Sequence, residues 1–136
     1  MILTIIYIAL AGVLAEFFVH YCRSILASSQ RIQLRADVCE AAGVDRDGVA
    51  PGDFERLLEL VRVCPEESSD DRSIRAVCTY YRLLRALGRA SRGLAPGVES
   101  WIEKEQRNCS HFAAVALDRR ISSTRRLLAQ RVQGSL

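Results

Sequence analysis

The sequence contains few helix-breaking residues and none of the common catalytic signatures. Only three of its 136 residues are proline and eight are glycine, which excludes collagen-like and low-complexity organisation. There is no phosphate-binding glycine loop, no GxSxG and no HExxH, and no alternating pattern long enough for a β-strand. We therefore expect an all-α protein that is not an enzyme and that builds one modest core.

Charge is nearly missing from the first 22 residues, where Glu16 is the only charged side chain. Twenty-two helical residues extend about 33 Å, enough to cross a hydrocarbon core about 30 Å thick. No Lys or Arg precedes the apolar residues, so the basic start of a cleavable signal peptide is missing. We interpret 1–22 as a transmembrane helix that continues into a bundle domain at 23–136. The alternative is a buried core helix.

The positive charges near this segment predict its orientation. No basic residue lies before it, whereas Arg23, Arg31 and Arg35 follow it. Basic residues favour the cytoplasmic side of a membrane. We expect a single-pass protein of a bacterial inner membrane, with its N-terminus outside and its C-terminal domain in the cytoplasm.

One face of the predicted transmembrane helix gathers its small and ionisable residues. At about 100° per residue, this face holds Ala9, Gly12, Glu16 and His20. Small residues let a second helix approach closely, and ionisable residues at membrane depth usually face protein. We interpret the face as a docking stripe for a partner helix. The alternative is that Glu16 and His20 lie near the interface and extend to water.

The pattern of the remaining residues predicts further helices, which complete a bundle of about four helices in total. The first helix continues through 23–42 to a loop or hinge at 43–52. Three more cover 53–64, 70–91 and 96–133, the last with a possible interruption at 108–110. The residues expected to face the core are Leu57, Leu58, Leu60, Val61, Cys64, Val77, Tyr80, Leu84, Leu87, Val98, Trp101, Ile102, Phe112, Ala113, Ala116 and Leu127.

Arginine is the other conspicuous feature, since 18 of the 19 basic residues are Arg. An acid-free stretch at 72–92 places most of its arginines on one helical stripe away from the predicted core. The candidates for partner contact there are Arg75, Arg82, Arg85 and Arg89. A second acid-free stretch contains Arg119, Arg120, Arg125, Arg126 and Arg131.

Three partners and one structural explanation compete for these arginines. They suit anionic lipid headgroups, an acidic protein surface or the phosphates of nucleic acid. Alternatively, the stripe is a solvent-exposed face that carboxylates of the bundle neutralise. Those carboxylates are Glu55, Glu59, Glu99 and Glu103. We expect no nucleic-acid partner, because a helix-turn-helix, an RNA-binding motif and zinc-finger spacing are missing.

The histidines and cysteines do not form a recognisable metal motif. No CxxC pair occurs, and the pairs His20/Cys22 and Cys109/His111 point about 200° apart on a helix. We therefore expect no metal site and no cofactor. His20 is the weak candidate for an axial ligand to a haem or chlorophyll.

The oxidation state expected for the five cysteines depends on the predicted orientation of the protein in the membrane. In the cytoplasm their thiols stay reduced and serve as small core residues. The opposite orientation would allow two disulfides, Cys39 with Cys64 and Cys78 with Cys109.

These patterns favour a non-catalytic membrane accessory subunit or adaptor. It would bind a larger membrane protein complex through the transmembrane helix and the arginine-rich face, and the pattern is also compatible with a homo-oligomer. One alternative is a cofactor-binding membrane subunit with His20 as ligand. Another is a soluble helical subunit whose first helix is buried by a partner.

Overall fold

The computed structural model describes residues 1–30, 51–64, 71–91 and 96–134. These residues form helices with no strand among them, as the sequence predicts. The elements are α1 (Ile2–Gln30), a 3-10 turn η1 (Pro51–Asp53), α3 (Phe54–Val63), α4 (Asp71–Ala90) and α5 (Pro96–Gly134). The predicted all-α class with an apolar N-terminal helix is confirmed.

The predicted helix ends agree closely with the structure, with two differences. The first helix does continue past residue 22 to Gln30, whereas the rest of its predicted extension and 43–50 of the loop lie outside the described residues. The end of the predicted loop forms the 3-10 turn Pro51–Asp53. The possible interruption at 108–110 does not occur: α5 is unbroken there, and Ser110 Oγ donates to Gln106 O, one turn earlier, at 3.2 Å.

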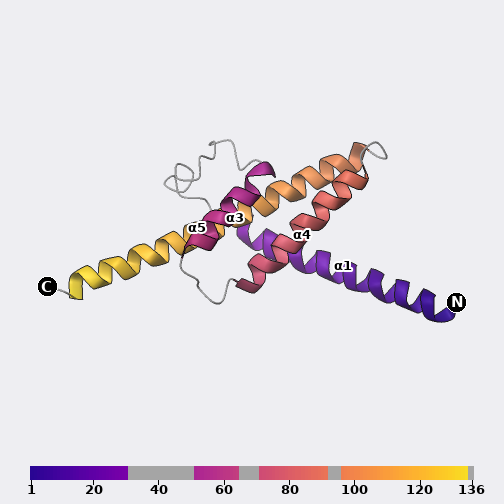
Figure 1. The fold of residues 1–136 in the computed structure, drawn as a ribbon, viewed down its shortest axis with the longest axis horizontal. Coiled ribbons are helices and arrows are strands. Elements are labelled where there is room, and N and C mark those ends of the chain that lie inside the picture. The colour runs from indigo at the N-terminus through magenta and orange to yellow at the C-terminus, as the bar shows by residue number, and fades with distance from the viewer. Residues whose placement is uncertain (31–50, 65–70, 92–95, 135–136) are drawn as a thin grey trace.

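Figure 1 shows α3 packed at the middle of the long helix α5 and α4 packed along its N-terminal half, with the end of α1 joining them. The N-terminal part of α1 and the C-terminal part of α5 extend beyond this bundle toward opposite ends of the molecule. The C-terminal end of α4 and the N-terminal end of α5 lie toward the same end of the molecule as the N-terminus. The bundle is therefore small, and two of its helices are longer than the core that they help to form.

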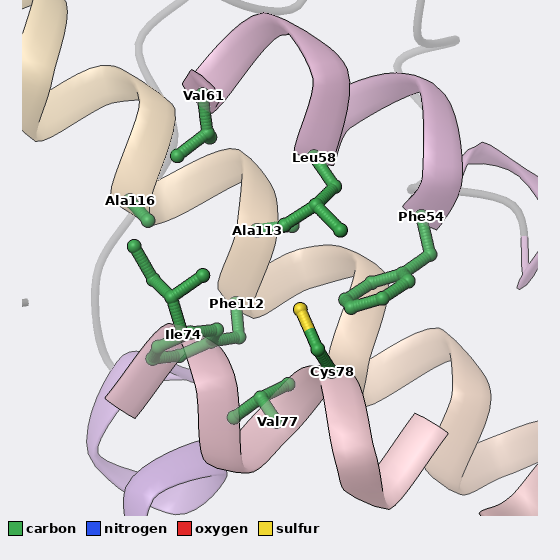
Figure 2. A pocket seen from close by; sticks show the side chains of 9 residues that line it. All are labelled: Phe54, Leu58, Val61, Ile74, Val77, Cys78, Phe112, Ala113 and Ala116. Atoms are coloured by element: carbon green, nitrogen blue, oxygen red, sulfur yellow. The ribbon is translucent and has the colours of Figure 1, made fainter. Parts of the chain in front are cut away.

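The centre of the core is formed by α3, α4 and α5. Figure 2 shows side chains from all three helices converging: Phe54, Leu58, Val61, Ile74, Val77, Cys78, Phe112, Ala113 and Ala116. The two alanines let the other helices approach α5 closely. The space left between these groups is about 10 Å³, which is at most the room one water molecule needs. This apolar centre is therefore packed core and not a ligand pocket.

The predicted core face of α4 is correct for three of its four residues. Val77, Tyr80 and Leu84 are buried, but Leu87 is 53% exposed. The buried face passes through Gly88 instead, where an added Cβ would lie 3.6 Å from Ile102 Cγ2. The residue four positions after Leu84 (Gly88) thus lies at the contact with α5, whereas the residue three positions after it (Leu87), which spacing predicted, does not.

Several other predicted core residues are also exposed. They lie at helix ends or flanks that the short neighbouring helices do not cover. These residues are Leu60, Val98, Trp101 and Leu127.

Candidate membrane anchor and docking surfaces

Helix α1 passes through two different environments along its length. Residues 2–17 are all exposed, whereas Cys22, Leu26 and Ser29 are buried against the bundle. The most apolar part of the helix has none of its residues buried, which differs from the core helix of a soluble protein. Among the described helices, α1 alone is long and apolar enough to cross a membrane.

The four residues of the predicted docking stripe lie together on the exposed part of α1. Ala9, Gly12, Glu16 and His20 are all exposed. A Cβ added at Gly12 would meet nothing within 4 Å in the described part of the chain, so this position is open there. In the described part of the chain, Glu16 and His20 are not joined by a hydrogen bond or a salt bridge. Both side chains are therefore available to an outside partner.

A buried carboxylate joins α1 to the bundle. Glu105 of α5 is 3% exposed. One of its oxygens lies 3.4 Å from Arg23 Nε of α1, and the other accepts a hydrogen bond of 3.3 Å from Tyr80 Oη of α4. Burial and the neighbouring Glu105 charge raise the pKa of Tyr80 well above its usual value, so its hydroxyl stays a donor. Three helices thus meet at one ionic group.

Further contacts extend this junction along α1. The Cys22 thiol lies 3.8 Å from Ala76 O on α4, and Gln30 Nε2 donates to Asn108 Oδ1 of α5 at 2.8 Å. Because α1 is one continuous helix, these contacts also fix the direction in which 2–17 leave the bundle. Sequence reasoning did not identify this junction. The sequence feature that indicates the junction is the position of Glu105 on the same face of α5 as Ile102 and Cys109, which lie three and four residues away.

The structure divides the predicted arginine stripe into two groups. All four candidates are exposed, but Arg75 pairs with Asp71 at 2.8 Å and Arg85 pairs with Glu55. Neither Arg82 nor Arg89 forms an ion pair with another described residue. The expected neutralisation by the bundle is therefore partial, and exposed pairs of this kind are worth about 0–1 kcal/mol each.

One arginine of the second acid-free stretch is a structural residue and not a surface charge. Arg120 is 3% exposed, and its Nη1 donates to Val61 O at 2.7 Å and to Cys64 O at 3.4 Å. A cation at the last carbonyls of α3 satisfies acceptors that the helix leaves unpaired. Nothing in the sequence distinguishes Arg120 from the exposed Arg125 and Arg126.

The described cysteines are free thiols. They are Cys22, Cys64, Cys78 and Cys109. The disulfide of Cys78 with Cys109, expected for the opposite orientation, is not formed, and Cys39 lies outside the described residues. Burial raises the pKa of the Cys109 thiol to about 12 and lowers the pKa of His111. Within the described ranges, no cluster of three His, Cys, Asp or Glu residues could hold a metal ion.

Comparison with known proteins adds no relative from which a role could be inferred. No family model, no curated protein and no solved structure matches the chain. The functional argument therefore depends on the exposed apolar part of α1, on its junction with the bundle and on the arginine-rich surface.

Proposed function

We propose that this protein is a non-catalytic single-pass membrane protein that serves as an accessory subunit or adaptor. In this proposal α1 crosses a bacterial inner membrane with its N-terminus outside, and the bundle lies in the cytoplasm. The protein binds a larger membrane complex through the docking stripe of α1 and through the arginine-rich surface of α4.

The observation that carries the proposal is the division of α1. Its apolar residues 2–17 are all exposed, while 22–30 are fixed to α4 and α5. Exposed apolar surface of this extent suits lipid or another protein. A helix fixed at its other end transmits its position directly to the bundle, as an adaptor requires.

The first experiment tests docking through α1. The full chain is purified in a mild detergent from its native host, and its partner is identified by mass spectrometry. Ala9→Leu is then compared with Ala11→Leu, since these exposed alanines point about 200° apart on the helix. Added bulk at Ala9 obstructs a close helix contact, so we expect Ala9→Leu to release the partner and Ala11→Leu to retain it.

Three outcomes contradict parts of the proposal. Equal retention by both variants contradicts docking through this stripe, and a solitary protein contradicts the accessory role. A visible absorption band from the purified protein would instead support a cofactor-binding subunit with His20 as ligand.

The second experiment tests the arginine-rich surface. Arg82→Gln with Arg89→Gln removes two charges without a described carboxylate partner, whereas Arg85→Gln removes a charge already paired with Glu55. We expect the double variant to weaken binding to the purified partner more than Arg85→Gln does, and more strongly at low salt because salt screens exposed charges. Equal binding at all salt concentrations would contradict an electrostatic role for this surface.

A further inference from the structure

A cleft beside the core is lined by arginines from three helices. It has a volume of about 530 Å³ and lies over the end of α3 and the first half of α4. Its basic residues are Arg62 of α3, Arg75 and Arg82 of α4, and Arg120 of α5. Cys78 and Ile74, which Figure 2 shows in the core below, also line the cleft.

Among the described residues that line this cleft, the charges do not balance. Asp71 is the one acid in that described lining, and it is already paired with Arg75 at 2.8 Å. Arg62 and Arg82 both lower the pKa of Cys78, against the larger effect of burial, which raises it. Arg62, Arg82 and Arg120 therefore give the described part of the lining a positive excess.

Arg120 makes the imbalance more costly because it is buried. Arg120 is 3% exposed and its Nη1 contacts two backbone carbonyls, but its Nε has no hydrogen-bond partner among the described residues. It forms no salt bridge with a carboxylate in the described part of the chain. The carbonyls at a helix end carry only partial negative charge. A buried cation without an anion is unfavourable, and the cleft beside Arg120 is wide enough to admit one.

We propose that this cleft binds a phosphate group, carried either by a soluble phosphate ester or by a phospholipid headgroup. Several acceptor oxygens let one phosphate engage more than one guanidinium, whereas a carboxylate has only two oxygens to offer. Arg62 and Arg82 border the cleft from two different helices, so a phosphate bound between them links α3 to α4. The inference does not depend on the accessory role proposed above.

The test follows Cys78, a half-buried residue that lines both the apolar core and the cleft. The full chain is placed in phosphatidylcholine nanodiscs and alkylated with iodoacetamide at increasing concentrations of inorganic phosphate. Peptide mass spectrometry compares Cys78 with Cys64, which does not line the cleft. We expect saturable slowing at Cys78, because a bound anion offsets the Arg62 and Arg82 charges that favour ionisation of this thiol.

Matched variants locate the binding. Arg62→Gln with Arg82→Gln should raise the phosphate concentration needed for half-protection by about tenfold or more, since two charge-assisted contacts are lost. Arg89→Gln, on the same helix but outside the cleft, should change it less than about twofold. Equal losses in the two variants would overturn the proposal.

A second arm identifies the source of the phosphate. Nanodiscs containing phosphatidic acid are tested without added phosphate, and glycerol 3-phosphate is tested in phosphatidylcholine nanodiscs. Protection of Cys78 by phosphatidic acid alone assigns the site to a lipid headgroup. Protection by the dissolved phosphates alone assigns it to a soluble ester. No saturable protection in either arm would overturn the proposal.

Discussion

The two ends of this molecule look alike in outline and differ in chemistry. The N-terminal segment of α1 (2–17) and the C-terminal segment of α5 (125–133) both extend beyond the bundle as exposed helix. The first carries one formal charge, Glu16. The second combines the exposed apolar residues Leu127, Leu128 and Val132 with three arginines.

This contrast shows that exposure alone does not identify a membrane segment. An arginine at the centre of a membrane helix costs about 2.5–3.5 kcal/mol on insertion scales. The three arginines of the second segment therefore disfavour its insertion into a membrane, although its leucines are as exposed as those of α1. The predictions below test this contrast and the bundle between the two segments, from the largest expected effect to the smallest.

Adding arginines should affect the two segments very differently. Leu10→Arg with Leu14→Arg places two charges in the apolar part of α1, which should disfavour membrane insertion by about 5–7 kcal/mol and release the chain from membranes. Leu127→Arg with Leu128→Arg is the matched pair in α5 and should leave membrane association unchanged. Fractionation after alkaline carbonate extraction measures both. Similar behaviour of the two pairs would remove the distinction between the segments.

Two leucines of α4 should report where the bundle core ends. Leu84→Ala removes a fully buried side chain and should lower the free energy of unfolding by about 2–5 kcal/mol. Leu87→Ala removes an exposed side chain and should change it by less than about 0.5 kcal/mol. Chemical denaturation in detergent micelles gives both values, and a large effect at Leu87 would show that the core reaches further toward the α4–α5 connection.

The attachment of α1 should depend on the pairing of Glu105. Arg23→Met leaves a buried carboxylate without its cation and should lower the free energy of unfolding by about 1–3 kcal/mol. The loss should shrink when Glu105→Gln is also present, because the carboxylate is then neutral. Arg131→Met in the exposed end of α5 is the control, with little effect expected. Additive losses in the double variant would mean that Arg23 acts without Glu105.

Alkaline pH should destabilise the buried middle of α5. The Cys109 thiol has its pKa raised from 9.0 to about 12 in the folded chain. Above about pH 9 the unfolded thiol loses its proton while the folded thiol keeps it, so stability falls by up to about 1.4 kcal/mol per pH unit until the folded pKa is reached. Cys109→Ala should flatten this slope, with the raised pKa values of Tyr80 and Tyr81 adding their part at higher pH. An unchanged slope in the variant would contradict a protonated buried thiol as its cause.

Much of the fold was predictable because local signals marked it. Pro96, the loop glycines and the apolar spacing indicate where helices begin and end, and the absence of charge identifies the exposed part of α1. Tertiary contacts were not predictable in this way. The exposure of Leu87 shows that apolar spacing alone mispredicts the buried face of α4, because the contact with Ile102 is made at Gly88 instead. Nothing in the sequence distinguishes the buried Arg120 from its exposed neighbours, since only the packing of α3 against α5 decides that burial.

The central claim is that α1 crosses a membrane while the end of α5 lies in water. Single cysteines at Leu3, Leu10 and Gln130 are treated with a membrane-impermeant maleimide in sealed vesicles of each orientation, and peptide mapping separates them from the natural thiols. The account predicts labelling of Leu3→Cys from outside only, of Gln130→Cys from the cytoplasmic side only, and of Leu10→Cys from neither side. Labelling of Leu3→Cys and Gln130→Cys from the same side would contradict it.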